Sequence, residues 1–206
     1  NMIVIIGFSH KQLDLEWRGK LALTSNERID ASLYWMSHIG PHCFIQTCNR
    51  LAFVMEAKDY RDDTVSQWLR AFSSRLGHKE LDYLQERVMI CHGSEAVSYL
   101  TRMSVGLESM VIGEDQILGQ FKEAWESGKD LGFTSKTINT VCLQVITFAK
   151  KMKTSYQGMQ RSVSVASLAV KQAMHCVAHI EQPVFLVVGR GETGQLIHTY
   201  LAPFAS

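Results

Sequence analysis

The stretch that decides the fold is Cys43–Glu56, CFIQTCNRLAFVME, in which the polar residues Thr47–Arg50 separate two largely apolar runs. Short apolar runs on either side of a polar turn predict two β-strands, here Cys43–Gln46 and Leu51–Glu56. Strands at this point predict a sheet, and the segments before and after them must supply the elements that pack on it.

Outward from this pair, the pattern alternates between strands and amphipathic helices. The additional predicted strands are Met2–Ile6 and Val88–Cys91, and the predicted helices are Asn26–His38 and Thr64–Leu76. Ser25 is the expected N-cap of the first helix. The residues with the spacing of its buried face are Ile29, Leu33 and Met36. The order β, α, β, β, α, β favours the α/β fold class, with a small N-terminal domain in which helices pack on a sheet.

From Ser94 onward the pattern is helical, which predicts a long helical segment after the α/β domain. The predicted helices are Glu95–Met110, Glu114–Gly128, Ser135–Tyr156 and Ser162–His179. Their predicted buried residues are, in chain order, Val97, Leu100, Met103 and Leu107; Ile117, Leu118, Phe121 and Trp125; Val141, Val145, Phe148 and Met152; and Val165, Ala169, Ala173 and Val177. Each set follows the three- and four-residue spacing of one helix face.

The last motif is GRGETG at Gly189–Gly194, which follows the apolar run Val184–Val188 and precedes the helical stretch Gln195–Leu201. A GxGxxG between a strand and a helix is typical of a dinucleotide-binding loop, because the glycines let a pyrophosphate approach the helix N-terminus. The alternative is an ordinary turn between a strand and a helix. The acidic residue that would confirm the motif is expected about 20 positions downstream, beyond Ser206.

The composition is that of an ordinary globular protein, with 46% hydrophobic and 20% charged residues and a net charge of +1. The longest apolar runs are too short to cross a bilayer, and five scattered cysteines predict reduced thiols in a cytoplasmic protein. The near-neutral total hides a basic segment, since residues 131–180 contain six Lys or Arg and no Asp or Glu. These are Lys136, Lys150, Lys151, Lys153, Arg161 and Lys171. The segment is either a solvated helix face or a surface that contacts phosphates.

Cys48 lies in the predicted polar turn, two residues before Arg50. A nearby guanidinium lowers the pKa of a thiol and also binds carboxylates, so this pair suits a nucleophilic cysteine that acts on an acidic substrate. The alternative is a cysteine that only occupies a turn. The other cysteines lie in apolar contexts and are predicted to be inert core thiols; they are Cys43, Cys91, Cys142 and Cys176.

Two further features are less specific. Gln116 and Gln120 share one polar helix face opposite Phe121, which is either a binding face or the solvent side of the helix. His92 follows a predicted strand and is a candidate base, ligand or loop residue. No second histidine stands at metal-ligand spacing from it, so no metal site is predicted.

Five motifs of the chain resemble those of glutamyl-tRNA reductases. They are GFSHK (7–11), TCNR (47–50), GLESMVIGEDQILGQ (106–120), SVSVASLAV (162–170) and GRGETG (189–194). They occur in the family's order and at its spacing across essentially the whole chain. TCNR together with the long 106–120 stretch is highly specific.

The resemblance implies an enzyme that binds glutamyl-tRNA and forms a thioester between its cysteine and the glutamyl group. NADPH then reduces the thioester to glutamate-1-semialdehyde, the first step of the five-carbon route to tetrapyrroles. Carried onto this sequence, Cys48 is the nucleophile. The implied substrate-binding residues are Thr47, Asn49, Arg50, Ser109, Glu114, Asp115, Gln116 and Gln120. The implied NADPH-binding residues are Gly189, Arg190, Gly191, Glu192, Thr193 and Gly194, and the basic segment becomes a candidate tRNA surface.

The resemblance also implies two domains. Residues 1–157 form the catalytic, substrate-binding domain, and residues 158–206 begin a Rossmann-type NADPH-binding domain. Because the family continues with the rest of that domain and a helical dimerisation region, we expect a monomeric fragment of a homodimeric enzyme, without reductase activity of its own. The segment after about Gln160 should be poorly anchored, or supported by another chain, because an isolated βα unit cannot bury its apolar faces.

Three residues depart from the family pattern. Tyr99 stands where the family often has a histidine thought to support the active site, Arg190 replaces a small residue, and Asp115 replaces a proline. A tyrosine hydroxyl, with a pKa of about 10, is a poor general base at neutral pH. Tyr99 is therefore a candidate supporting residue, and the alternative is a non-reducing tRNA-binding or regulatory relative of the same fold.

Overall fold

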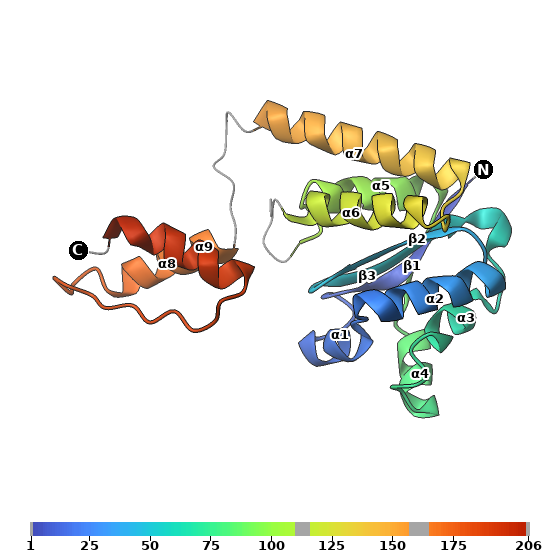
Figure 1. The fold of residues 1–206 in the computed structure, drawn as a ribbon, viewed down its shortest axis with the longest axis horizontal. Helices are drawn as coiled ribbons and strands as arrows, with labels where there is room; N and C mark the ends of the chain where they lie inside the picture. The colour runs from blue at the N-terminus through green and yellow to red at the C-terminus, as the bar shows by residue number, and fades with distance from the viewer. Residues whose placement is uncertain (1, 110–115, 157–164, 205–206) are drawn as a thin grey trace.

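The computed structural model describes residues 2–109, 116–156 and 165–204, and its centre is a four-stranded sheet (Figure 1). The strands are β1 (Ile3–Ser9), β2 (His42–Thr47), β3 (Arg50–Glu56) and β4 (Met89–His92). They lie in the order β2-β3-β1-β4, and all neighbours are antiparallel. This is the strand order of a split β-α-β arrangement, and the four predicted strands are confirmed to within a few residues.

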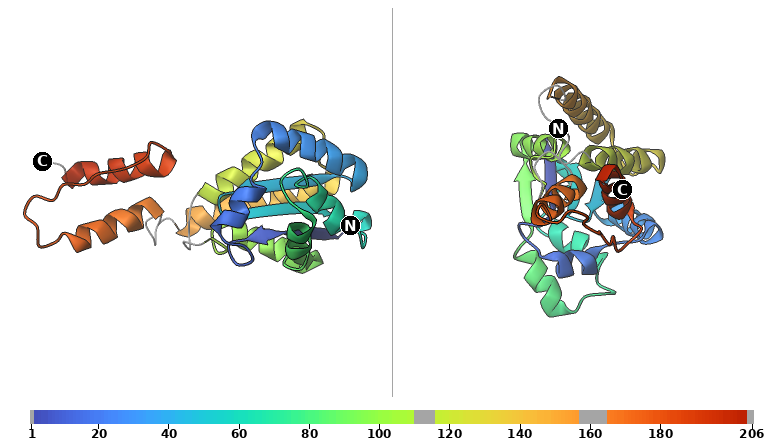
Figure 2. Two further views of the ribbon diagram at one scale, coloured as in Figure 1. Left: turned by 90° about the horizontal axis from the view of Figure 1, so that it is seen from below. Right: turned by 90° about the vertical axis from the view of Figure 1, so that its left-hand side faces the viewer.

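Helices cover both faces of the sheet (Figures 1 and 2). On one face lie α1 (Leu15–Leu21), α2 (Ser25–His38), α3 (Thr64–Arg70) and α4 (His78–Gln85). On the other lie α5 (Gly93–Ser104), α6 (Gln116–Asp130) and α7 (Lys136–Tyr156). The chain continues with α8 (Val165–Cys176) and α9 (Glu192–Leu201), which pack against each other. Short 3₁₀ helices span Ala57–Asp59 and Ala202–Phe204.

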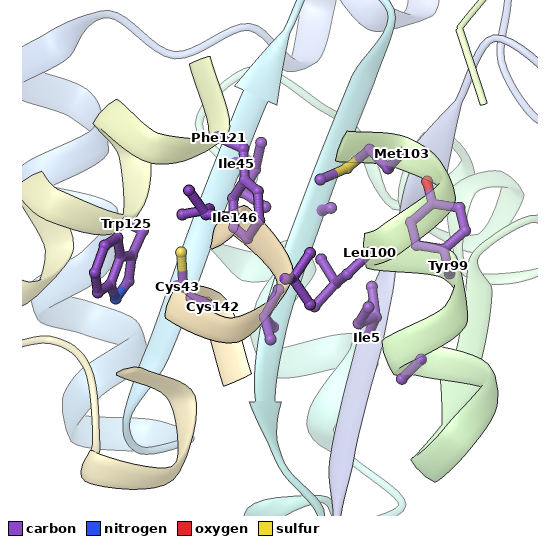
Figure 3. Packing of buried hydrophobic residues seen from close by; sticks show 14 of the residues in the cluster. Ile5, Cys43, Ile45, Tyr99, Leu100, Met103, Phe121, Trp125, Cys142 and Ile146 are labelled. Carbon is purple, nitrogen blue, oxygen red and sulfur yellow. The ribbon is translucent and has the colours of Figure 1, made fainter. Parts of the chain in front are cut away.

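The strands have two buried faces, so alternate residues enter two different cores. Ile5 of β1 packs with the layer of α5, α6 and α7, whereas its neighbour Ile6 packs with the layer of α1–α4. Figure 3 shows the first of these cores, where Phe121 of α6 and Leu100 of α5 approach the strands. Position 7 of β1 requires a glycine, because a Cβ there would lie 2.2 Å from the carbonyl oxygen of Leu51 on the neighbouring strand β3.

The start and the buried face of α2 differ from the prediction. Thr24, not Ser25, is the N-cap, and it forms a capping box with Glu27. The predicted core residues of α2 are at least 38% exposed: Ile29 41%, Leu33 57% and Met36 38%. Trp35 is fully buried instead, because its large ring fills the space between Phe44 and Phe53 of the sheet.

The buried faces of the later helices are only partly as predicted. The prediction is confirmed for all four residues of α6, for Leu100 and Met103 of α5, and for Val145 of α7. It is wrong for the exposed residues Val97, Leu107, Phe148, Val165 and Ala169. The helix predicted over Glu95–Met110 ends at Ser104, because Gly106 adopts a φ of 81° that breaks the helical backbone.

The predicted strand Val184–Val188 is not a strand in the structure. Val184, Leu186 and Val188 are 96%, 88% and 88% exposed. A strand needs a hydrogen-bonded neighbour, and no other described segment pairs with this one. The start of a Rossmann-type domain therefore remains an expectation. None of the described helices has the length and apolarity that a membrane span requires.

Candidate active site at the β2–β3 hairpin

Cys48 lies at the tip of a tight hairpin. Thr47 of β2 pairs with Arg50 of β3, so Cys48 and Asn49 alone form the turn. The Asn49 amide donates a hydrogen bond to Oγ1 of Thr47 (3.2 Å), and the Cys48 side chain is exposed at the tip. The sequence placed these four residues together because a two-residue turn between strands is a local structure.

Two groups from the beginning of the chain hold this turn. Nε of Arg18, a buried residue of α1, donates to the Cys48 carbonyl (3.0 Å). The backbone amide of His10, which follows β1, donates to the Asn49 carbonyl (3.1 Å). Both turn carbonyls are therefore paired, which fixes the backbone that carries the thiol.

Arg50 is a buried cation with unused donors. The residue is only 1% exposed, and its Nη2 donates to the backbone carbonyl of Glu108 (2.5 Å). Its Nε and Nη1 are buried and have no hydrogen-bond partner among the described residues. Unpaired charged donors in a protein interior are costly, so a ligand that accepts hydrogen bonds, such as a carboxylate, would be stabilised here.

Tyr99 of α5 lies against this guanidinium. The Arg50 carbon Cζ is 5.6 Å from the centre of the Tyr99 ring, within the range of a cation–π contact. The Tyr99 hydroxyl is buried and has no hydrogen-bond partner in the described part of the chain. Burial raises the pKa of Tyr99 although Arg50 opposes the shift, so the hydroxyl stays protonated at neutral pH.

Glu108 links three segments around the hairpin. Its carboxylate accepts from Nζ of Lys11 (2.6 Å) and from Nε of Arg102 (2.8 Å), while its carbonyl accepts from Arg50. Burial opposes ionisation of Glu108, but the hydrogen bonds from Lys11 and Arg102 and the charges of these two side chains together outweigh it and lower its pKa. The carboxylate is therefore anionic at neutral pH and offsets part of the positive charge of the site.

The other cysteines are less suited to act as nucleophiles. Cys43, Cys91 and Cys142 are buried, as predicted, and Figure 3 shows Cys43 of β2 beside Cys142 of α7. The hydrogen bond with Cys142, together with burial, raises the pKa of Cys43 well above its usual value, and burial raises that of Cys91. The prediction is wrong for Cys176, which is exposed near the end of α8 because that helix packs mainly on α9.

The remaining substrate residues implied by the resemblance are only partly brought together. Ser109 directly follows Glu108, so it lies next to the Arg50 contact. Gln116 begins α6, and Gln120 lines a different cavity of about 420 Å³ between α2, β2 and α6, whose lining does not include Cys48. Glu114 and Asp115 lie outside the described residues.

The loop Gly189–Gly194 has backbone features that only glycine satisfies. Gly189 has a φ of 112°, and a Cβ on Gly194 would lie 2.4 Å from the Gly189 carbonyl oxygen. Gly191 is the N-cap of α9, which begins at Glu192 and not at Gln195 as predicted. The loop therefore leaves a helix N-terminus open to a phosphate, with Arg190 and Thr193 exposed beside it. The Glu192 side chain lies outside the described residues.

Five residues of the site were not singled out by the sequence. They are His10, Lys11, Arg18, Arg102 and Glu108. Two of the quoted motifs contained a signal for three of them, namely GFSHK for His10 and Lys11 and GLESM for Glu108. Polar residues directly after an apolar strand or after a helix often line a site. No group of three or more His, Cys, Asp or Glu that could hold a metal occurs among the described residues.

The fold and the hairpin together define a mixed α/β domain that presents an exposed thiol two residues from a buried guanidinium. The chain belongs to the glutamyl-tRNA reductase family, because residues 6–156 match the model of the "Glutamyl-tRNAGlu reductase, N-terminal domain". This match covers most of the chain and includes the hairpin.

Individual relatives agree with this assignment. The chain is 32% identical to a glutamyl-tRNA reductase of Pseudoalteromonas translucida over 202 residues and 33% identical to one of Shewanella baltica over 201 residues. Each alignment covers 97% of this chain and 47% of the relative. The structure resembles that of the glutamyl-tRNA reductase from Methanopyrus kandleri, with a TM-score of 0.65, 26% identity, and coverage of 98% and 47% of the two chains. The chain thus spans about half the length of the relatives it matches.

Proposed function

We propose that this chain is the substrate-binding and thioester-forming part of an NADPH-dependent glutamyl-tRNA reductase. The observation that carries the proposal is the exposed Cys48 two residues from Arg50, whose buried Nε and Nη1 have no partner among the described residues. Arg50 binds the side-chain carboxylate of the glutamyl group, which places the ester carbonyl at the tip of the hairpin.

Cys48 then forms the covalent intermediate. Its sulfur attacks the carbonyl carbon, the S–C bond forms, and the C–O bond to the terminal ribose breaks, so the glutamyl group becomes a thioester. Thr47, Asn49, Ser109, Gln116 and the residues Glu114 and Asp115 complete the substrate site in this proposal, with Tyr99 as a supporting neutral donor. Gln120 contributes only if it turns from the cavity that it lines here.

NADPH is the proposed reductant, and Gly189–Gly194 would hold its pyrophosphate. The fit rests on the positive φ of Gly189, the close approach at Gly194 and the open N-terminus of α9. When bound, NADPH supplies the hydride for the formation of glutamate-1-semialdehyde. In this proposal residues 1–157 form the substrate domain and residues 158–206 begin the cofactor domain, and the whole protein is a cytoplasmic homodimer.

The proposed tRNA surface is the basic segment 131–180. Lys136, Lys150 and Lys151 are exposed on α7, and Lys171 is exposed on α8. With no acidic residue in this segment, phosphates would meet little repulsion there. Arg161 lies outside the described residues.

Transfer of label from glutamyl-tRNA to the protein tests the proposal. We expect radiolabelled glutamate to become attached to the wild-type chain and to be released by hydroxylamine, which cleaves thioesters. Cys48→Ser should accept no label, because serine does not form an anionic nucleophile near neutral pH. Alanine variants of Cys43, Cys91, Cys142 and Cys176 serve as controls and should still accept it. Mass spectrometry that found the glutamyl group on one of these four would refute the assignment.

The fate of the same label in the full-length protein separates the proposal from its alternative. A non-reducing tRNA-binding or regulatory relative is favoured by Tyr99, which is neutral and a poor base. Such a protein would bind glutamyl-tRNA, but its whole length would release no semialdehyde when NADPH is added.

A further inference from the structure

Thioester formation needs a group that moves a proton, and most ionisable groups around the hairpin cannot do so near neutral pH. Arg18, Arg50 and Arg102 stay cationic, as arginine does throughout this range. Glu108 stays anionic because Lys11 and Arg102 hydrogen-bond its carboxylate, and Tyr99 stays neutral because it is buried.

Lys11 is held by the Glu108 carboxylate (2.6 Å), which leaves His10 as the candidate among the described residues. His10 follows β1, and its amide hydrogen bond to the Asn49 carbonyl places it against the turn that carries Cys48. Nδ1 of its ring is buried and has no hydrogen-bond partner in the described part of the chain. A buried ring nitrogen without a structural partner, on a residue whose backbone is bonded to the turn of the nucleophile, is available for chemistry.

The surroundings of His10 keep its ring neutral. Burial is the main cause of its lowered pKa, and the cations Arg50, Lys11 and Arg18 lower it further, against the opposing effect of Glu108. A neutral imidazole can accept a proton at neutral pH, and the same cations favour a nearby thiolate.

We infer that His10 transfers the proton during thioester formation at Cys48. This inference rests on the proposed function. His10 takes the proton of the Cys48 thiol as the sulfur attacks the carbonyl carbon, and gives it to the ribose oxygen as the C–O bond breaks. One S–C bond forms and one C–O bond breaks, and nothing is oxidised or reduced. Tyr99, at the position where a histidine is often found in the family, then needs to supply only a hydrogen bond.

The test is the pH dependence of single-turnover labelling by glutamyl-tRNA, measured from about pH 5.5 to 8.5. In the wild-type chain the rate should fall only as the pH drops below the usual histidine pKa of 6.5. In His10→Asn, which keeps a polar group but cannot titrate, it should fall about 100-fold at neutral pH. The labelling rate of His10→Asn should also keep rising up to the highest pH measured, because in this variant only the pre-formed thiolate reacts.

Three controls make the result specific. Added imidazole should partly restore labelling of His10→Gly, which a structural role would not allow. Tyr99→Phe should keep the shape of the wild-type profile, and so should His78→Asn, which changes the exposed first residue of α4. Thermal unfolding checks that each variant is folded.

The outcomes separate the inference from the proposed function. If the wild-type chain accepts label and the labelling rate of His10→Asn is lower by the same factor at every pH, the inference is overturned and the proposed function stands. A wild-type chain that accepts no label would show that the proposed function is wrong, and the inference would fall with it.

Discussion

Arg50→Lys is the substitution that most directly tests how the hairpin selects its substrate. It keeps the positive charge but replaces the planar, five-donor guanidinium by an ammonium on a flexible stem. In the structure Nη2 is already used by the Glu108 carbonyl, and Nε and Nη1 are unpartnered among the described residues. A lysine therefore cannot hold Glu108 and bind a carboxylate in the same geometry.

The expected magnitude follows from the hydrogen bonds that are lost. A hydrogen bond to a charged group contributes about 1.5–3 kcal/mol. Because about 1.4 kcal/mol corresponds to a factor of ten, discrimination should fall by about 10- to 100-fold. The loss should appear as selectivity, since the thiol of Cys48 and the turn that carries it are unchanged.

The assay compares labelling by glutamyl-tRNA with labelling by glutaminyl-tRNA, whose amide has the shape of the carboxylate without its charge. We expect the ratio of the two rates to drop in Arg50→Lys and to stay unchanged in Arg70→Lys, which alters the exposed last residue of α3. Thermal unfolding gives the accompanying loss of stability. A folded Arg50→Lys variant with the wild-type ratio would refute the carboxylate-binding role.

The remaining predictions concern stability, measured by denaturant unfolding. Gly7→Ala should destabilise the sheet by about 1–3 kcal/mol, because its Cβ would meet the Leu51 carbonyl at 2.2 Å. Gly19→Ala in α1 is the control and should be neutral or stabilising by up to about 1 kcal/mol, because nothing lies within 4 Å of its Cβ; equal losses would contradict the close approach. His42 is buried against Gly40, and burial lowers its pKa to about 4 from 6.5. The neutral ring thus contributes stability that is complete above pH 6.5 and is lost as the pH falls toward 4, by about 3 kcal/mol. His42→Phe should flatten this part of the pH profile, and an unchanged slope would show that other groups cause it.

The sequence by itself determined the local features of this protein. The apolar runs around Thr47–Arg50 were enough to predict the hairpin, because the two strands and the turn are adjacent in the chain. The buried face of α6 was predictable for the same reason, since its four core residues share one clear stripe. The motif that carries Cys48 and Arg50 was likewise visible before the fold was known.

Packing decided what local patterns left open. Ile29 and Trp35 each fit a possible buried face of α2. The face with Trp35 is the buried one because it packs on Phe44 and Phe53 of the sheet. Val184–Val188 has the composition of a strand, but a strand also needs a neighbour for its hydrogen bonds, and the described chain brings none to it.

The surroundings of the hairpin depended on tertiary structure most of all. Glu108 reaches Arg50 from 58 positions away, and Arg18 reaches Cys48 from 30 positions away. His10 meets Asn49 only because β1 and β3 pair in one register. The sequence thus determined which residues can do chemistry, whereas the folding of distant segments onto one sheet decided which charges surround them, because contacts between distant segments are not encoded in local spacing.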